Sequence, residues 1–265
     1  MAKKYIFLNI RNRAGSVQHY YHFLLGLLVP LVLRMDAAEQ SGEDVTFLVR
    51  SCGPMDRHLL SFNFLNLVIV DCQNSTIDVQ LKYDVDHEFI DGFDDPGYYS
   101  ALAFVNAKKI IKKRLINNMD HSENAKVINT IIINRSVDSF YNSERSEIKT
   151  SGIERRSIVN FNELELLVKE KFSDACTLTL ENATLADQVL KFENATTIIA
   201  QHGAALANII FCGRQTKIVE IIPRRMLTIG HFSKLANMIG LKYSYYVTDH
   251  NHAVVDLKEF SSNFI

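Results

Sequence analysis

The sequence predicts an α/β protein of two lobes, each with a parallel β-sheet covered by helices. Apolar strand-like runs alternate with helical segments along the 265-residue chain, a pattern typical of parallel sheets with helical crossovers. Gly and Pro number only 11 and 4, which favours long regular elements. The polar run NNMDHSENAK at 117–126 interrupts the alternation. We therefore expect an N-terminal lobe of residues 1–122, a C-terminal lobe of residues 123–265 and a cleft between them.

The first half of the chain starts with a strand and a long helix. The apolar run FLLGLLVPLVL is shorter than the roughly 20 residues that cross a bilayer, so it indicates a core helix that Pro30 kinks. Acidic residues accumulate from Thr76 to Gly97, where we expect irregular structure. The predicted strands are 4–10, 45–50 and 67–71, and the predicted helices are 19–39, 55–62 and 99–118.

The second half alternates more regularly. Thr184 and Asp187 have the spacing of a helix cap, as do Asn162 and Glu165, and Gly240 is a typical helix stop. Parallel sheets of this kind bind ligands at the carboxyl ends of their strands. The predicted strands are 127–133, 176–180, 196–200, 217–222 and 242–247, and the predicted helices are 163–172, 184–192, 204–211 and 226–239.

The segment TTIIAQHGAALANIIFCGRQTKIVEIIP, residues 196–223, contains the main candidate site. A strand ends at Gln201, and His202, Gly203 and Ala204 then open a helix with little side-chain bulk. Free N–H groups and the helix dipole at such a turn favour a phosphate, to which His202 adds a hydrogen bond or a charge. Glu220 ends the next strand, where a carboxylate can accept hydrogen bonds from ribose hydroxyls.

Composition and charge exclude several classes of protein. The 29 Lys and Arg residues balance 30 Asp and Glu residues, for a net charge of −1, so no nucleic-acid partner and no basic membrane patch are indicated. The N-terminus reads as a strand rather than a signal peptide. We expect a soluble, cytoplasmic protein without a membrane anchor or transmembrane segment; its oligomeric state stays open.

Several motifs together resemble glycosyltransferase family 61. HGAALANIIF followed by KIVEIIP is similar to the family signature HGAGLTN…VVEI. INR at 133–135 and RSIVNFNEL from Arg156 are similar to further family segments, and the resemblance extends over about residues 127–245. In the first half of the chain, only HYYHFLLGLL is similar to a family segment, the N-terminal helix. Ala205 stands where the family often has Gly. The family includes plant xylan arabinosyl- and xylosyltransferases and the N-acetylglucosaminyltransferases of EGF domains and O-linked mannose.

The resemblance implies an inverting glycosyltransferase with a GT-B-like fold of two Rossmann-like lobes. The C-terminal lobe would bind a nucleotide sugar, such as UDP-xylose or UDP-N-acetylglucosamine, and the N-terminal lobe a glycan or glycoconjugate acceptor. Neither a cofactor nor a divalent metal is expected, because arginines can neutralise the departing diphosphate. Arg135 and Arg156 have this role, with Arg155 as the substitute for Arg156. Glu181 would line the base pocket, whereas Gln188 and Asn208 are expected to be structural.

Inverting transfer also needs a general base for the acceptor hydroxyl. The candidates are His19 and His22 at the start of the long helix, together with Asp91, Asp94 and Asp95. We place His22 first, because it lies in the segment similar to the family, and Asp91 with it. Arg13, in the loop before these histidines, could reach the donor or the acceptor.

Two other functions stay open. Asp84-Val85-Asp86 has the DxD pattern that binds a divalent metal to a diphosphate, which would make the transfer metal-dependent. A non-catalytic module that binds nucleotides or glycans is the second alternative. An NAD-dependent oxidoreductase is disfavoured, because HGAALAN lacks the G-x-G-x-x-G pattern.

Overall fold

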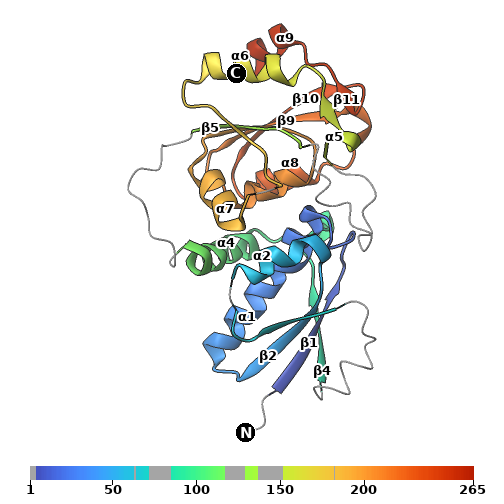
Figure 1. The fold of residues 1–265 in the computed structure, drawn as a ribbon, viewed down its shortest axis with the longest axis vertical. Helices are drawn as coiled ribbons and strands as arrows, with labels where there is room; N and C mark the ends of the chain where they lie inside the picture. Colours follow the sequence, from blue (N-terminus) through green and yellow to red (C-terminus); the bar gives the residue numbers. More distant parts are fainter. Residues whose placement is uncertain (1–3, 63, 72–84, 117–128, 137–151, 182) are drawn as a thin grey trace. The chain divides into compact units, whose positions relative to one another are not determined.

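The structure is a computed structural model that describes residues 4–62, 64–71, 85–116, 129–136, 152–181 and 183–265. The chain forms two compact units, Met1–Asn117 and Asn118–Ile265, here called the N-terminal and C-terminal units (Figure 1). The boundary predicted at residue 122 lies outside the described residues and stays a prediction, as does the cleft. Within the described ranges, no helix combines the length and apolar character that a membrane crossing requires.

The N-terminal unit contains a four-stranded parallel sheet in the order β3-β2-β1-β4. Successive strands β1, β2 and β3 extend the sheet in one direction, and β4 joins on the other side of β1. The point at which the order reverses is where open α/β sheets bind ligands. The elements are β1 (Lys4–Arg11), η1 (His22–Leu28), α1 (Val29–Ser41), β2 (Val45–Arg50), η2 (Gly53–Met55), α2 (Asp56–Leu60), β3 (Leu67–Val70), β4 (Val85–Asp91), η3 (Pro96–Tyr98) and α4 (Ala101–Ile116).

The long helix of this unit starts as a π-helix, η1, and continues as α1. In η1 the Val29 N–H donates to the carbonyl of Leu24, five residues back. Pro30 has no N–H to continue this pattern, so Leu25 keeps a free carbonyl, and the N–H of Phe93 binds it at 2.9 Å. Pro30 therefore changes the winding of the helix and leaves an attachment point for the segment after β4.

The C-terminal unit contains a five-stranded parallel sheet in the order β10-β9-β8-β5-β7. Its order reverses between β5 and β8. Helices α6 and α9 cover one face, and α7 and α8 the other (Figure 1). The elements are β5 (Thr130–Ile133), α5 (Gly152–Arg155), β6 (Ser157–Ile158), α6 (Phe161–Lys171), β7 (Cys176–Leu178), α7 (Leu185–Asn194), β8 (Thr197–Gln201), η4 (Ala204–Phe211), β9 (Lys217–Pro223), η5 (Arg224–Met226), α8 (His231–Met238), β10 (Lys242–Thr248), β11 (His252–Ala253) and α9 (Leu257–Phe264).

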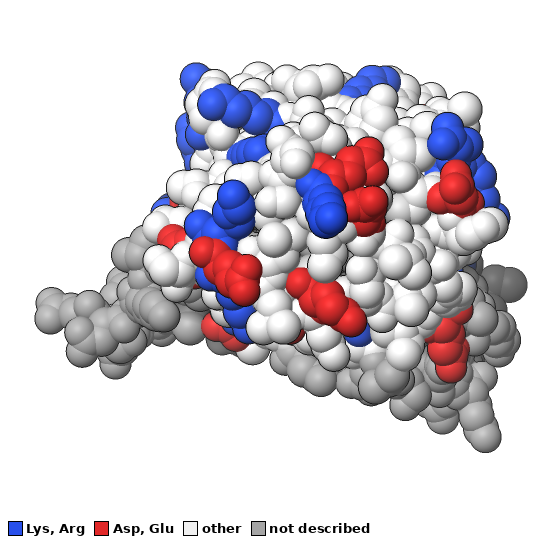
Figure 2. Space-filling model, turned by 90° about the horizontal axis from the view of Figure 1, so that it is seen from above, with Lys and Arg blue, Asp and Glu red and all other residues white. Residues whose placement is uncertain are grey.

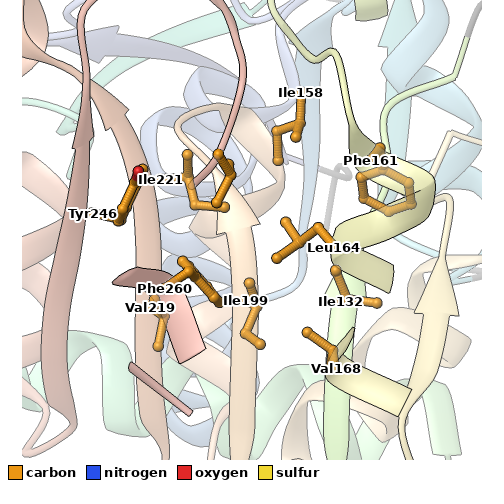
Figure 3. Packing of buried hydrophobic residues seen from close by; sticks show 11 residues of the cluster. Ile132, Ile158, Phe161, Leu164, Val168, Ile199, Val219, Ile221, Tyr246 and Phe260 are labelled. Atoms are coloured by element: carbon orange, nitrogen blue, oxygen red, sulfur yellow. The ribbon is translucent and has the colours of Figure 1, made fainter. Parts of the chain in front are cut away.

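A buried apolar cluster holds the C-terminal sheet to α6 and α9. Side chains of the central strands meet Leu164 of α6 and Phe260 of α9, both 0% exposed (Figure 3). Burial of this kind is the main favourable term in folding. Figure 2, which views the molecule from above Figure 1, shows acidic and basic side chains interspersed in small groups.

The predicted α/β class with parallel sheets is confirmed, and three local predictions are wrong. The acidic segment before Gly97 contains β4, whose charged side chains suit an edge strand. The helix predicted at 204–211 is confirmed, as the 3₁₀ helix η4; it is buried from Leu206 to Phe211, so packing rather than helix propensity sets its winding. Helix α8 begins only after Gly230, whose φ of 57° is left-handed. Asn160, not Asn162, precedes α6, and its side chain binds the backbone of Val255 instead of capping the helix.

Candidate functional site

The turn after β8 lies at the carboxyl ends of β5 and β8, where the order of the C-terminal sheet reverses. Arg135 follows β5, and its Nη2 donates to the carbonyl oxygen of His202 at 2.6 Å. Its Nη1 donates to the carbonyl oxygen of Gly152 at 3.2 Å. A Cβ at position 203 would collide with the guanidinium of Arg135, so this contact requires the glycine. The structure thus brings Arg135 onto the predicted phosphate turn.

A buried carboxylate orients the imidazole of His202. Nδ1 of His202 lies 2.6 Å from Oε1 of Glu220, and the hydroxyl of Tyr243 donates to Oε2. Glu220 is 1% exposed. Because its oxygens are occupied and buried, this geometry does not fit the predicted ribose contact; Glu220 instead fixes the ring. A carboxylate accepts the Nδ1 proton, so Nε2 of His202 is left for a ligand.

The site has an excess of positive charge around Arg156. Arg156 is 6% exposed, and its Nε has no hydrogen-bond partner among the described residues. Burial lowers the pKa of Arg156 to about 9, and the guanidinium groups of Arg135, Arg155 and Arg225 act in the same direction. Glu220 acts in the opposite direction. The group is still cationic at pH 7, and a buried charge of this kind is costly until an anion pairs with it.

The other residues predicted on this unit lie at the same edge of the sheet but differ in their contacts. Glu181, after β7, accepts from the N–H of Ser136 at 3.4 Å. Gln201 is buried, and its Nε2 donates to the carbonyls of Ser157 and Asn251 at 3.1 and 2.9 Å. These bonds tie β8 to β6 and to the segment before β11. Ala204 opens η4 and is partly buried.

Two residues expected to be structural contact each other in the core of the same unit. Nδ2 of Asn208 donates to Oε1 of Gln188 at 2.8 Å. Nε2 of Gln188 donates to the carbonyl of Ala183 at 3.2 Å. Since both side chains are buried, this pair holds η4 against α7.

A second histidine is oriented by a carboxylate in the N-terminal unit. Nδ1 of His22 lies 2.6 Å from Oδ2 of Asp94, whose side chain is 0% exposed. The N–H of Ala14 donates to both carboxylate oxygens of Asp94 at 3.2 Å. Ala14 follows β1 and Asp94 follows β4, so the pair lies where the order of this sheet reverses. The position matches that of His202 in the other unit.

The remaining predicted residues of this unit surround the loop after β1. The ring of His19 lies edge-on to that of His22, with centroids 6.3 Å apart. Arg13 is exposed and makes no hydrogen bond or ion pair within the described ranges. Asp91 ends β4; its Oδ1 accepts from Asn12 at 2.9 Å and lies 3.5 Å from Nε of Arg11. No contact joins Asp91 to His22 in the part of the chain described, and its catalytic role stays a prediction.

The metal-binding alternative rests on a segment that the structure describes only in part. Asp84 lies outside the described residues. Asp86, on β4, is exposed and pairs with Lys4 at 3.3 Å. Over the described ranges, no group of three or more His, Cys, Asp or Glu side chains is placed to hold a metal ion.

Sequence reasoning missed three features of these sites. It considered Asp94 only as an alternative base, not as the partner of His22. It did not single out Arg225, in the pair that follows Pro223, or Tyr243, whose hydroxyl binds Glu220. The register of β10 and β9 places Tyr245, not Tyr243, opposite Glu220, so the contact of Tyr243 with Glu220 has no signal in the sequence. The pairing of His22 with Asp94 has no signal in the sequence, since 72 positions separate them.

Comparison with known proteins gives consistent results. A family model described as Glycosyltransferase 61 matches residues 20–219. Protein O-linked-mannose beta-1,4-N-acetylglucosaminyltransferase 2 is similar to part of this chain. The Homo sapiens protein is 35% identical over 74 residues, which are 28% of this chain and 13% of that protein. The Mus musculus protein is 35% identical over 98 residues, 36% of this chain and 17% of that protein. The alignments thus span less than a fifth of these relatives.

Proposed function

The chain belongs to glycosyltransferase family 61, and we propose that it transfers a sugar from a nucleotide donor to a glycan or glycoconjugate acceptor, with inversion and without a metal ion. The C-terminal unit would bind the nucleotide sugar and the N-terminal unit the acceptor. UDP-N-acetylglucosamine is the first donor to test, since the similar proteins are named as N-acetylglucosaminyltransferases. UDP-xylose is the second.

The observation that supports this function most strongly is the excess of positive charge around Arg156. The buried guanidinium lies near three others, with Glu220 as the opposing charge, and Glu220 is already bound to His202 and Tyr243. A diphosphate would supply the missing negative charge and accept hydrogen bonds from arginine and backbone N–H groups. These contacts strengthen as charge develops on the leaving group, which is how they would accelerate transfer.

We assign the proton transfer to His22. Its Nε2 would take the proton of the acceptor hydroxyl as the hydroxyl oxygen attacks the anomeric carbon. The bond from that carbon to the diphosphate oxygen breaks, and its electron pair leaves with the nucleoside diphosphate. A single displacement inverts the configuration at the anomeric carbon. The imidazolium that results lies against the carboxylate of Asp94.

The test is the change in melting temperature that UDP causes in the wild type, Arg156→Met and Arg214→Met. A ligand that binds the native state raises its melting temperature by mass action. We expect UDP to stabilise the wild type and Arg214→Met, whose exposed arginine precedes β9. Arg156→Met should lose the response, with at least a tenfold weaker Kd for UDP. Its melting temperature without ligand should stay the same or rise, because a buried unpaired charge is removed.

An unchanged Kd for UDP in Arg156→Met would contradict the diphosphate assignment. Incubation of the wild type with labelled UDP-N-acetylglucosamine then distinguishes an enzyme from a binding module. Slow release of free sugar and UDP indicates a catalyst, whereas an intact donor under saturating conditions indicates the non-catalytic alternative.

A further inference from the structure

We propose that Asp94 is the positioning residue that holds His22 in the tautomer with the proton on Nδ1 and the lone pair on Nε2. This inference rests on the proposed function for its catalytic consequence, but the tautomer itself can be measured without activity. It assigns a role to a carboxylate that the sequence offered only as an alternative base.

The carboxylate of Asp94 has the burial and the contacts that this role requires. Its side chain is 0% exposed, and both of its oxygens accept from the N–H of Ala14. The backbone carbonyl of Asp94 accepts from the hydroxyl of Tyr21 at 3.1 Å. Burial raises the pKa of Tyr21, so this hydroxyl stays a donor. The contacts therefore fix both the main chain and the side chain of Asp94.

The helix backbone adds a further constraint on the same segment. The N–H of Phe93 binds the carbonyl of Leu25, which Pro30 leaves free. On the other side, a Cβ at Gly26 would lie 2.9 Å from Cγ of Asp94, which is closer than packed carbon atoms approach. The glycine and the π-helix together allow the carboxylate to reach the start of the helix. Such π-helical turns are frequent at functional sites.

The imidazole of His22 is held at Nδ1 and open at Nε2. A carboxylate has no proton to donate, so the 2.6 Å contact places the shared proton on Nδ1. Within the described residues Nε2 has no hydrogen-bond partner, and the side chain is 23% exposed. The ring packs against Gly15, where a Cβ would collide with it. Asp94 and Gly15 thus fix the ring, while Nε2 remains available to a hydroxyl group.

The catalytic consequence follows from where the proton goes. When Nε2 takes the proton of the acceptor hydroxyl, the ring gains a positive charge, and Asp94 stabilises it through the bond to Nδ1. Replacement of a carboxylate by an amide in such a pair favours the opposite tautomer, which has no lone pair at the reacting nitrogen; in a serine protease it lowers kcat about 10⁴-fold. Asp94 acts only through His22 and does not contact the substrate itself.

The experiment measures the His22 tautomer by ¹⁵N NMR of the full chain labelled at histidine, with His22→Gln to assign the signals. We expect a protonated Nδ1 and a bare Nε2 in the wild type and in the control Asp36→Asn, whose carboxylate binds Gln40 in the same unit. Asp94→Asn should lose the protonated Nδ1. A wild-type ring protonated at Nε2, or a tautomer unchanged in Asp94→Asn, would overturn the inference. The wild-type spectrum decides the matter even if Asp94→Asn does not fold.

A kinetic experiment separates this inference from the proposed function. The substrate is UDP-N-acetylglucosamine or UDP-xylose, whichever stabilises the wild type, and the release of UDP is measured. We expect Asp94→Asn to lower kcat about 10²–10⁴-fold and to leave KM nearly unchanged. In a His22→Ala background, Asp94→Asn should cause no further loss, whereas a merely structural role would add one. If the tautomer is as expected but His22→Ala keeps normal turnover, the base assignment fails and the positioning role stands.

Discussion

At the scale of single residues, each unit contains a histidine whose Nδ1 faces a buried carboxylate. The distances are 2.6 Å for His22 with Asp94 and 2.6 Å for His202 with Glu220. Asp94 and Glu220 are each about 1% exposed or less. This arrangement fixes ring orientation, so each Nε2 can meet a ligand at a defined position. The two histidines are assigned different partners, the acceptor hydroxyl and the diphosphate, because the unit of His202 contains Arg135, which binds the carbonyl of His202.

The substitution Gly203→Ala adds one methyl group and tests whether the turn at 202–204 binds the diphosphate. In Gly203→Ala the new Cβ would collide with the guanidinium of Arg135, so the arginine must leave the turn. We expect a tenfold or larger increase in the Kd for UDP, measured by isothermal titration calorimetry, with the fold retained. Gly213→Ala is the control, because its Cβ would find no atom closer than 3.7 Å. Equal affinities in the two variants would show that Arg135 does not contribute at this turn.

At the scale of elements, loops at the carboxyl ends of strands hold the candidate site residues. β5 and β8 end beside Arg135 and His202, and β1 and β4 end beside Ala14 and Asp94. Helix α2, by contrast, contributes a histidine to the buried core. In α2, His58 is 2% exposed and its ring lies 5.7 Å from those of Tyr20 and Phe23, so it is part of the apolar core.

His58 should make the stability of the protein depend on pH. Burial, with a smaller effect of Arg57, lowers its pKa from 6.5 to about 4 in the folded state. Above pH 6.5 the ring is neutral in both states. Below that, the unfolded chain binds a proton and the folded chain does not, so the free energy of unfolding decreases as the pH falls, by up to about 3 kcal/mol near pH 4.

Urea denaturation between pH 7 and pH 4 measures this effect. His58→Leu should reduce the loss of stability over this range, whereas His250→Gln, which replaces an exposed histidine, should leave it unchanged. If His58→Leu shows the same decrease as the wild type, other groups are responsible for it.

At the scale of the whole molecule, the chain consists of two α/β units, and the strands of each main sheet are parallel. Each unit has its own reversal of strand order and its own histidine site. A nucleotide-sugar transferase needs two kinds of chemistry, neutralisation of the leaving group and removal of the acceptor proton. The arginine-rich site supports the first, and the His22–Asp94 pair supports the second. The proposed function thus uses both units.

The absence of a metal requirement is a prediction for the whole enzyme. We expect EDTA to leave the rate of sugar transfer unchanged, because arginines would neutralise the diphosphate. Asp86→Asn should also have no effect, since this exposed side chain pairs with Lys4. Loss of activity in EDTA with recovery on addition of Mn²⁺ would favour the metal-dependent alternative at Asp84-Val85-Asp86.

The sequence alone determined the α/β class, most strands and the turn between Gln201 and Ala204, because these depend on local hydrophobic periodicity and on small residues after a strand. Prediction from the sequence failed for features that do not depend on residues nearby in the chain. The edge strand β4 looks irregular in sequence because its polar side chains face away from the core. Only the tertiary structure brought Asp94 to His22, Tyr243 to Glu220 and Arg225 toward Arg156. Such contacts depend on strand order, which brings together residues that are distant in sequence, and on burial, which removes water from their charges.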